Sequence, residues 1–163
     1  MSERSGRAVF SAAAAAFIPR GRSEVLLVHH ARSGMWVQPG GKSEWDEPPM
    51  VTCRREATEE LGGVSVEVGR LLVVNWLTKS AELFPGAALN EFAYPCNLFT
   101  FHATLAPGAE DRIRVPEREL LGWRWWDIDD ACRPGVMEPY NARNLRAAAT
   151  AYHEGQSTAY LES

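Results

Sequence analysis

Three glutamates, Glu56, Glu59 and Glu60, lie within a short stretch of the sequence that runs from Pro49 to Leu61. After its first residue this stretch contains neither Gly nor Pro, and Gly62-Gly63 follows it, so the pattern predicts a helix. At about 100° per residue, the three carboxylates fall on one side of that helix. Glu56 and Glu60 are one turn apart, where like charges destabilise a helix by about 0.2–0.5 kcal/mol. A positive group is therefore expected beside them.

Two kinds of positive group meet this requirement. Arg55 can form a bidentate pair with Glu47 of the preceding loop, but one guanidinium cannot neutralise three further carboxylates. A hard divalent cation can, because Mg²⁺ takes oxygen ligands from protein carboxylates and from substrate phosphates, and we allow Mn²⁺ as a substitute. An ionised glutamate could then deprotonate the water that attacks a diphosphate. The simpler alternative is that an acidic helix face is merely solvated.

The spacing around these residues follows a longer pattern. Five residues separate Gly41 from Glu47, seven more precede Arg55-Glu56, and Glu59-Glu60 and Gly62 complete the series. This resembles the Nudix box, G-x5-E-x7-R-E-U-x-E-E-x-G-U, where U is a bulky aliphatic residue. Every fixed polar and glycine position is matched, whereas Ala57 and Gly63 depart from the aliphatic positions.

The resemblance to the MutT-like Nudix hydrolases implies an α/β fold, an α/β/α sandwich with a mixed β-sheet. It also implies a metal cluster made by three box glutamates and one main-chain carbonyl: Gly40, Glu56, Glu59 and Glu60. Arg55 and Glu47 would hold the loop that starts at Gly41. The base varies across the family, and Glu56 is our first choice. Our candidates for catalysis are Arg55, Glu56, Glu59 and, from outside the box, Glu119.

Three candidates outside the box have equally simple structural interpretations. Glu119 precedes a Trp-containing strand, but it could be one solvated acid among several in that loop. Arg32 could bind a substrate phosphate or be an ordinary surface charge. Trp36 could stack on a base, as could Trp45 or Trp76. The remaining tryptophans, at 123, 125 and 126, are expected in the core. His29-His30 alternate along a strand and are not expected to share a metal site.

The elements that position these residues are predicted from apolar patterning. The segments 8–18 and 25–28 read as two arms of a hairpin. Strands are predicted at 64–76, 97–105 and 123–128, a helical turn at 128–132 and a closing helix at 140–153. Residues 79–95 form a long excursion that could overhang a site. On the box helix, Met50, Cys53, Ala57 and Leu61 should face a sheet. We expect one domain over 1–163, with a flexible tail from 155 to 163.

Composition narrows the function classes. The chain has 163 residues and a net charge of −4, so it has no basic field for nucleic acid. No apolar stretch reaches the roughly 20 residues of a membrane span. The three cysteines are odd in number and form no CxxC pair, which favours a reducing, cytoplasmic location. A homodimer is left open.

The resulting expectation is a Mg²⁺-dependent hydrolase of a diphosphate linkage. Its small-molecule substrate would be a nucleoside diphosphate joined to another moiety, such as a nucleoside triphosphate or a nucleotide sugar. One alternative is a Nudix-fold module that binds nucleotides without cleaving them. A second alternative is a hydrolase of a non-nucleotide diphosphate.

Overall fold

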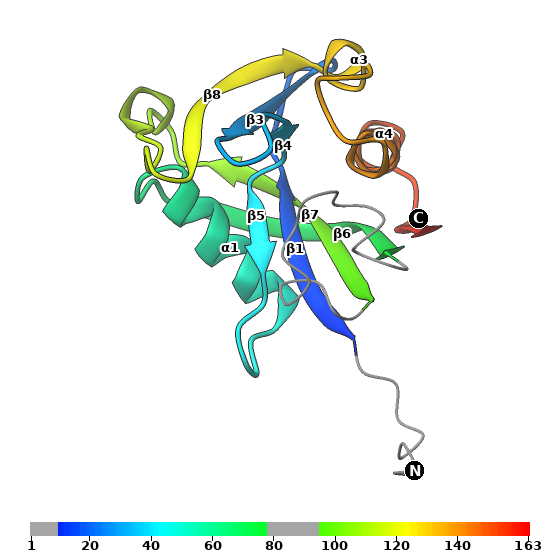
Figure 1. The fold of residues 1–163 in the computed structure, drawn as a ribbon. Helices are drawn as coiled ribbons and strands as arrows, with labels where there is room; N and C mark the ends of the chain where they lie inside the picture. Colours follow the sequence, from blue (N-terminus) through cyan, green and yellow to red (C-terminus); the bar gives the residue numbers. More distant parts are fainter. Residues whose placement is uncertain (1–9, 78–94) are drawn as a thin grey trace.

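The structure is a computed structural model that describes residues 10–77 and 95–163 (Figure 1). The elements of these residues, in chain order, are β1 (Ser11–Phe17), β2 (Pro19–Arg20), β3 (Glu24–His30), β4 (Trp36–Val37), β5 (Gly40–Lys42), α1 (Pro49–Glu60), β6 (Val66–Leu77), β7 (Cys96–Leu105), the 3-10 turn η1 (Glu110–Arg112), β8 (Leu120–Asp127), α3 (Ile128–Ala131), α4 (Pro139–His153) and β9 (Ala159–Glu162).

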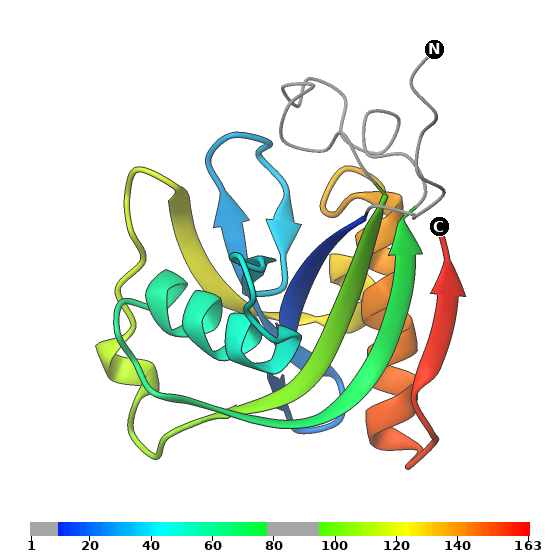
Figure 2. The same cartoon turned by 90° about the horizontal axis from the view of Figure 1, so that it is seen from below.

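The described strands form two sheets. The larger sheet has the order β5-β1-β7-β6-β9, and it is mixed because β1 pairs in parallel with β7 and β6 in parallel with β9. In the smaller sheet β3 pairs antiparallel with β2, β4 and β8. Helices α1 and α4 lie on opposite sides of the larger sheet (Figures 1 and 2). The predicted α/β/α arrangement with a mixed sheet is confirmed.

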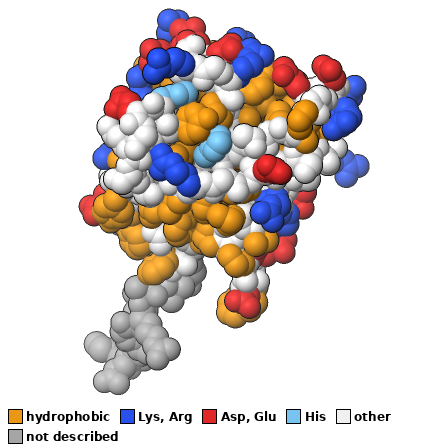
Figure 3. Space-filling model, turned by 180° about the vertical axis from the view of Figure 1, so that it is seen from behind, with side chains coloured by type: hydrophobic (Ala, Val, Ile, Leu, Met, Phe, Trp, Pro, Cys, Tyr) orange, Lys and Arg blue, Asp and Glu red, His pale blue; other side chains and the backbone are white. Residues whose placement is uncertain are grey.

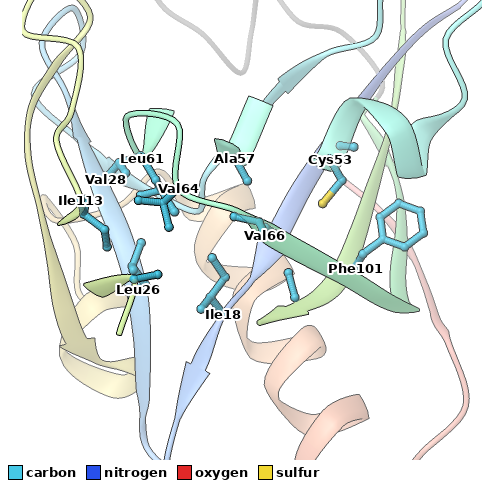
Figure 4. Packing of buried hydrophobic residues seen from close by; sticks show 14 of the residues in the cluster. Ile18, Leu26, Val28, Cys53, Ala57, Leu61, Val64, Val66, Phe101 and Ile113 are labelled. Atoms are coloured by element: carbon cyan, nitrogen blue, oxygen red, sulfur yellow. The ribbon is translucent and has the colours of Figure 1, made fainter. Parts of the chain in front are cut away.

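Side chains alternate between the two faces of β1, so this strand contributes to one hydrophobic cluster under α1 and to another under α4. On β1, Ala14 and Ala16 belong to the cluster packed under α1, whereas Phe17 belongs to the cluster under α4. Figure 4 shows Cys53, Ala57 and Leu61 of the helix side directed toward the same interior as strand residues such as Ile18 and Val66. The alanine-rich β1 therefore brings its backbone close to helices on both faces.

Helix α1 occupies the predicted range and begins with Pro49 in its first turn. Cys53, Ala57 and Leu61 are fully buried, as predicted for the sheet-facing side. Met50 is 41% exposed, so its assignment to that side was wrong, and Thr52 is buried instead. The reason is local, since the Thr52 hydroxyl donates to Glu47 and thereby ties the first turn to the preceding loop.

The helix ends at two glycines that differ in their surroundings. Both have positive φ, +76° at Gly62 and +86° at Gly63. A Cβ on Gly62 would lie 2.0 Å from the carbonyl oxygen of Arg114, whereas a Cβ on Gly63 would meet nothing within 4 Å. Gly62 is thus required by close backbone packing as well as by conformation.

This pair allows a matched stability test. Gly63→Ala should destabilise the fold by about 1–2 kcal/mol, the strain of a left-handed residue. Gly62→Ala should cost about 2–5 kcal/mol, because the clash with Arg114 adds to that strain. Urea unfolding of both variants measures the difference. Equal losses would show that the Arg114 contact does not matter.

Two expectations about strands are wrong. The predicted hairpin of 8–18 against 25–28 is not found in its described part, residues 10–18. From that part only the short β2 pairs with β3, while β1 runs into the other sheet beside β5 and β7. The tail is not frayed throughout, because β9 pairs with β6. Ala159 and Leu161 pack on the α4 side, and Tyr160 is exposed, so a short alternating pattern holds the end of the chain.

The other elements agree with expectation. Strands β6, β7 and β8, the turn α3 and helix α4 all cover the predicted segments within about three residues. Trp123 and Trp125 pack on one face of β8, and Trp126 packs on the other, as predicted. The predicted excursion lies outside the described residues, except for Pro95.

The surface of the described part carries no dominant charge on the face seen in Figure 3. Lys and Arg side chains are interspersed there with Asp and Glu, and hydrophobic side chains gather below them (Figure 3). Within residues 10–77 and 95–163, no helix is long and apolar enough to cross a membrane.

Candidate active site

The loop before α1 is fixed by a two-pronged ion pair. Arg55 Nε donates to Glu47 Oε1 at 2.8 Å, and its Nη2 donates to Glu47 Oε2 at 2.9 Å. Glu47 also accepts the Glu44 N–H and the Thr52 hydroxyl. The Arg55 contact and these hydrogen bonds lower the pKa of Glu47 to about 2, and Glu47 in turn raises the pKa of Arg55. The structure therefore brings together the two residues expected to hold this loop.

Arg55 also orients the acidic face of α1. Its Nη1 donates to Glu56 Oε1 at 2.7 Å and approaches Glu59 Oε2 at 3.5 Å. The Glu59 side chain is 62% exposed, so that contact is weak. A second Nη2 bond reaches the carbonyl of Lys42, which links the helix to β5. One guanidinium thus holds the loop, the strand and the Glu56 carboxylate in one arrangement.

Glu60 points in the other direction and is buried. Its Oε2 accepts the Gly40 N–H at 3.0 Å, and its Oε1 lies 3.8 Å from His30 Nε2. Burial raises the pKa of Glu60, which the His30 and Gly40 contacts oppose. The nearby Glu56 charge adds to the rise. This carboxylate is therefore desolvated beside a like charge, without an arginine or lysine of its own among the described residues.

The carboxylates of Glu56 and Glu60 both reach the strand that starts at Gly40-Gly41. A Cβ on Gly41 would lie 2.4 Å from the Glu56 carboxyl carbon, and a Cβ on Gly40 would lie 2.2 Å from the carbonyl oxygen of Ala14. Side chains at either glycine would displace the carboxylate or the neighbouring strand. The two glycines thus leave room for the acids beside the backbone of β5.

These residues fit a hard divalent cation by donor type. Glu56, Glu59 and Glu60 supply oxygen atoms, and the under-compensated, buried Glu60 is the group that a cation would stabilise most. In the described part of the chain, no three acidic, histidine or cysteine side chains already converge on one point. Glu59 is exposed and would have to turn away from Arg55 to join the other two.

Sequence reasoning missed His30. It sits at the end of β3, and a register shift between His29 and His30 in the pairing with β8 accompanies its position beside Glu60. His29 faces elsewhere and stacks on Trp36 at 4.5 Å. The alternation of the two histidines was the available signal, but nothing local indicates that α1 lies against one of them.

The remaining candidates lie outside the carboxylate group. Trp36 contacts His29 and, edge to face, Trp126 in the cluster under α4, so the structure does not bring it to the carboxylates. Arg32 lies in the exposed turn after β3. Glu119 has an exposed side chain, and its carbonyl accepts the Ala31 N–H, which places its backbone one residue away from His30.

A pocket of about 280 Å³ adjoins the carboxylates. Gly40, Gly41 and His30 line one part of it, and Leu98 and Tyr140 line an apolar part. A larger hollow of about 480 Å³ lies under the loop at 43–48, away from Glu60. The smaller pocket is the better candidate for substrate, because it shares residues with the acidic site.

Comparison with known proteins decides the family. The model of the NUDIX domain matches residues 9–148. The chain belongs to the Nudix hydrolase family. The resemblance of its box is therefore confirmed, and the protein is an enzyme, a Nudix hydrolase.

Solved structures share the fold of this Nudix hydrolase. A UDP-X diphosphatase matches with 21% identity and a TM-score of 0.69, covering 98% of this chain and 70% of that one. An ADP-ribose pyrophosphatase from Streptococcus suis matches with 22% identity and a TM-score of 0.68, covering 93% and 99%. A NUDIX hydrolase from Nitrosomonas europaea matches with 20% identity and a TM-score of 0.68, covering 92% and 93%. No curated protein sequence matches.

Proposed function

We propose that this Nudix hydrolase cleaves the diphosphate linkage of a nucleoside diphosphate joined to another moiety, such as a nucleoside triphosphate or a nucleotide sugar. The observation that carries the proposal is the placement of two carboxylates against Gly40-Gly41, one of them buried and short of positive charge. Binding of a cation would stabilise such a pair of carboxylates. A diphosphate supplies anionic oxygens that would complete the coordination shell of that cation.

The proposed cofactor is Mg²⁺, with Mn²⁺ as a substitute. Glu56, Glu59, Glu60 and the Gly40 carbonyl would hold it, and when bound it would withdraw charge from the phosphorus under attack. Arg55 holds the Glu56 carboxylate in place through its 2.7 Å contact. Glu56 is the proposed base for the attacking water, with Glu59 next in order and Glu119 as the candidate from outside the box.

The adjoining pocket supports a substrate with a compact group next to its diphosphate. At about 280 Å³ the pocket is near the lower end of ligand sites, about 300–1,000 Å³, so it suits one ring system. Two structures with this fold are named for enzymes of UDP-X and of ADP-ribose. A small-molecule partner is proposed, with no nucleic acid or membrane. The homodimer and the cytoplasmic location stay sequence-based predictions.

The test is a panel of diphosphates incubated with the full chain and Mg²⁺. It should contain nucleoside triphosphates, nucleotide sugars, dinucleotides and an alkyl diphosphate, with phosphate, pyrophosphate and nucleoside monophosphate as the measured products. We expect metal-dependent cleavage of at least one nucleotide compound. Cleavage of the alkyl compound alone would favour a non-nucleotide substrate. Nucleotide binding without turnover of any compound would favour a regulatory module.

A further inference from the structure

One wall of the pocket beside the carboxylates contains a buried amide whose nitrogen has no hydrogen-bond partner among the described residues. Gln38 lies between β4 and β5, lines the pocket and is 9% exposed. Its Oε1 accepts from Asn144 Nδ2 at 3.3 Å. Among the described residues no partner lies within hydrogen-bond distance of Gln38 Nε2, which is fully buried. A buried amide N–H of this kind is costly to leave unpaired.

The partners of Gln38 are fixed from two further elements. Asn144 on α4 is 1% exposed, and its Nδ2 also donates at 2.8 Å to the hydroxyl of Thr100, a fully buried residue of β7. Asn144 Oδ1 is likewise unpaired within the part of the chain that the structure describes. Three buried polar side chains therefore meet behind the pocket wall, with one donor and one acceptor left over.

The network can leave either the nitrogen or the oxygen of the Gln38 amide unpaired without losing its internal hydrogen bonds. If both amides turn by half a rotation, Asn144 Oδ1 accepts from Thr100 and from Gln38 Nε2, and Gln38 Oε1 and Asn144 Nδ2 become the unpaired atoms. The terminal torsion of a glutamine is soft, so this rotation costs little. Other walls of the pocket, Leu98 and Ala15 among them, are apolar. His30, Lys42, Tyr140 and Asn141 also line the pocket, but Gln38 is the lining residue with a buried, unpaired amide atom in the described part of the chain. That amide is suited to reading the edge of a flat, uncharged ring.

We propose that the Gln38 amide, packed against Asn144, turns toward this pocket and determines substrate specificity by hydrogen-bonding the polar edge of a nucleobase there. The inference rests on the proposed function and deepens it. Gln38 is three residues before Gly41, where the Glu56 carboxylate lies, so the ring and the diphosphate of one substrate would occupy neighbouring positions. A base-free diphosphate would leave the amide unpaired and would bind less tightly.

Binding of nucleoside 5′-monophosphates and of ribose 5-phosphate, measured by calorimetry without metal, tests the proposal apart from turnover. Wild type should bind at least one monophosphate about 5- to 100-fold more tightly than ribose 5-phosphate. Gln38→Met keeps the length of the side chain and removes the amide, and it should abolish this preference. Gln156→Met is the matched control, because Gln156 is exposed and contacts Glu154. It should keep the preference.

A second readout covers the case in which Gln38→Met does not fold. In wild type, the NMR signal of the Gln38 side-chain NH₂ should shift when the preferred monophosphate is added, and it should not shift with ribose 5-phosphate. An unshifted signal, or a preference retained in folded Gln38→Met, overturns the proposal. If the diphosphate panel shows turnover and Gln38 shows no role, the inference alone fails. If Gln38 governs binding without any turnover, the proposed function alone fails.

Discussion

Replacing Glu60 with glutamine is expected to lower kcat by about 10²-fold or more while the fold persists. The amide carbonyl can still accept the Gly40 N–H, so the local hydrogen bond survives and the negative charge is lost. Steady-state kinetics across a Mg²⁺ titration measures the loss. Glu67→Gln removes an exposed glutamate of β6 and should leave kcat unchanged. Near-normal turnover of Glu60→Gln would reject its role as a metal ligand.

The same substitution should raise the melting temperature of the metal-free protein. Burial raises the pKa of Glu60, so the fold favours the protonated acid. The stabilising contribution of the protonated acid is complete below the ordinary pKa of 4.5. It is lost as pH rises through the higher pKa of Glu60 in the folded protein. At pH 7 without metal, Glu60→Gln should therefore melt higher than wild type. The gap should shrink as pH falls toward 4.5, and a lower melting temperature at pH 7 would contradict this account.

Together these two effects distinguish a functional acid from a structural one. A carboxylate that served the fold would leave the metal-free protein weaker when it is neutralised, because its hydrogen bond to Gly40 would lose the assistance of charge. A carboxylate kept for a cation carries a desolvation penalty until the cation arrives. Loss of activity combined with a gain of metal-free stability is the outcome expected only of the second kind.

Much of the acidic site follows from the sequence, because its parts are close in the chain. Glu47 and Arg55 are eight residues apart, and the loop plus two helical turns between them suffices to bring them together. Helical periodicity predicts that one side of the helix faces the sheet, and this side carries the buried residues Cys53, Ala57 and Leu61. The wrong prediction at Met50 is also informative. The orientation of the first helical turn depends on the preceding loop, which the Thr52 hydroxyl contacts through Glu47.

The parts that could not be predicted depend on distant contacts. His30 meets Glu60 because β3 and α1 pack on the same interior, and no local pattern encodes that contact. The Gln38 network joins a loop, a strand and a helix across sequence separations of 106 and 44 residues. Strand β1 was expected beside β3, but its partners β5 and β7 are selected by the fold as a whole.

Loss of the Arg55 guanidinium is the second change with a large expected effect on activity and stability. Arg55→Ala should reduce kcat at least about tenfold and lower the melting temperature by several degrees, because the guanidinium holds Glu47, Glu56 and the Lys42 carbonyl together. Arg54→Ala is the matched control, since Arg54 is the exposed neighbour on the same helix, and it should leave both quantities unchanged. Arg55→Lys should not restore activity, because an ammonium cannot form the two-pronged contact.

An acid titration tests whether the ion pair between Arg55 and Glu47 itself stabilises the fold. The pKa of Glu47 is lowered from 4.5 to about 2, so its contribution to stability is complete above 4.5 and is lost as pH falls through about 2. The difference in melting temperature between wild type and Arg55→Ala should therefore stay constant from pH 7 to about 5 and narrow below that. A difference that persists unchanged to pH 2 would show that Arg55 stabilises the fold by packing and by its hydrogen bond to the Lys42 carbonyl. In that case the ion pair with Glu47 would have no part in holding the loop.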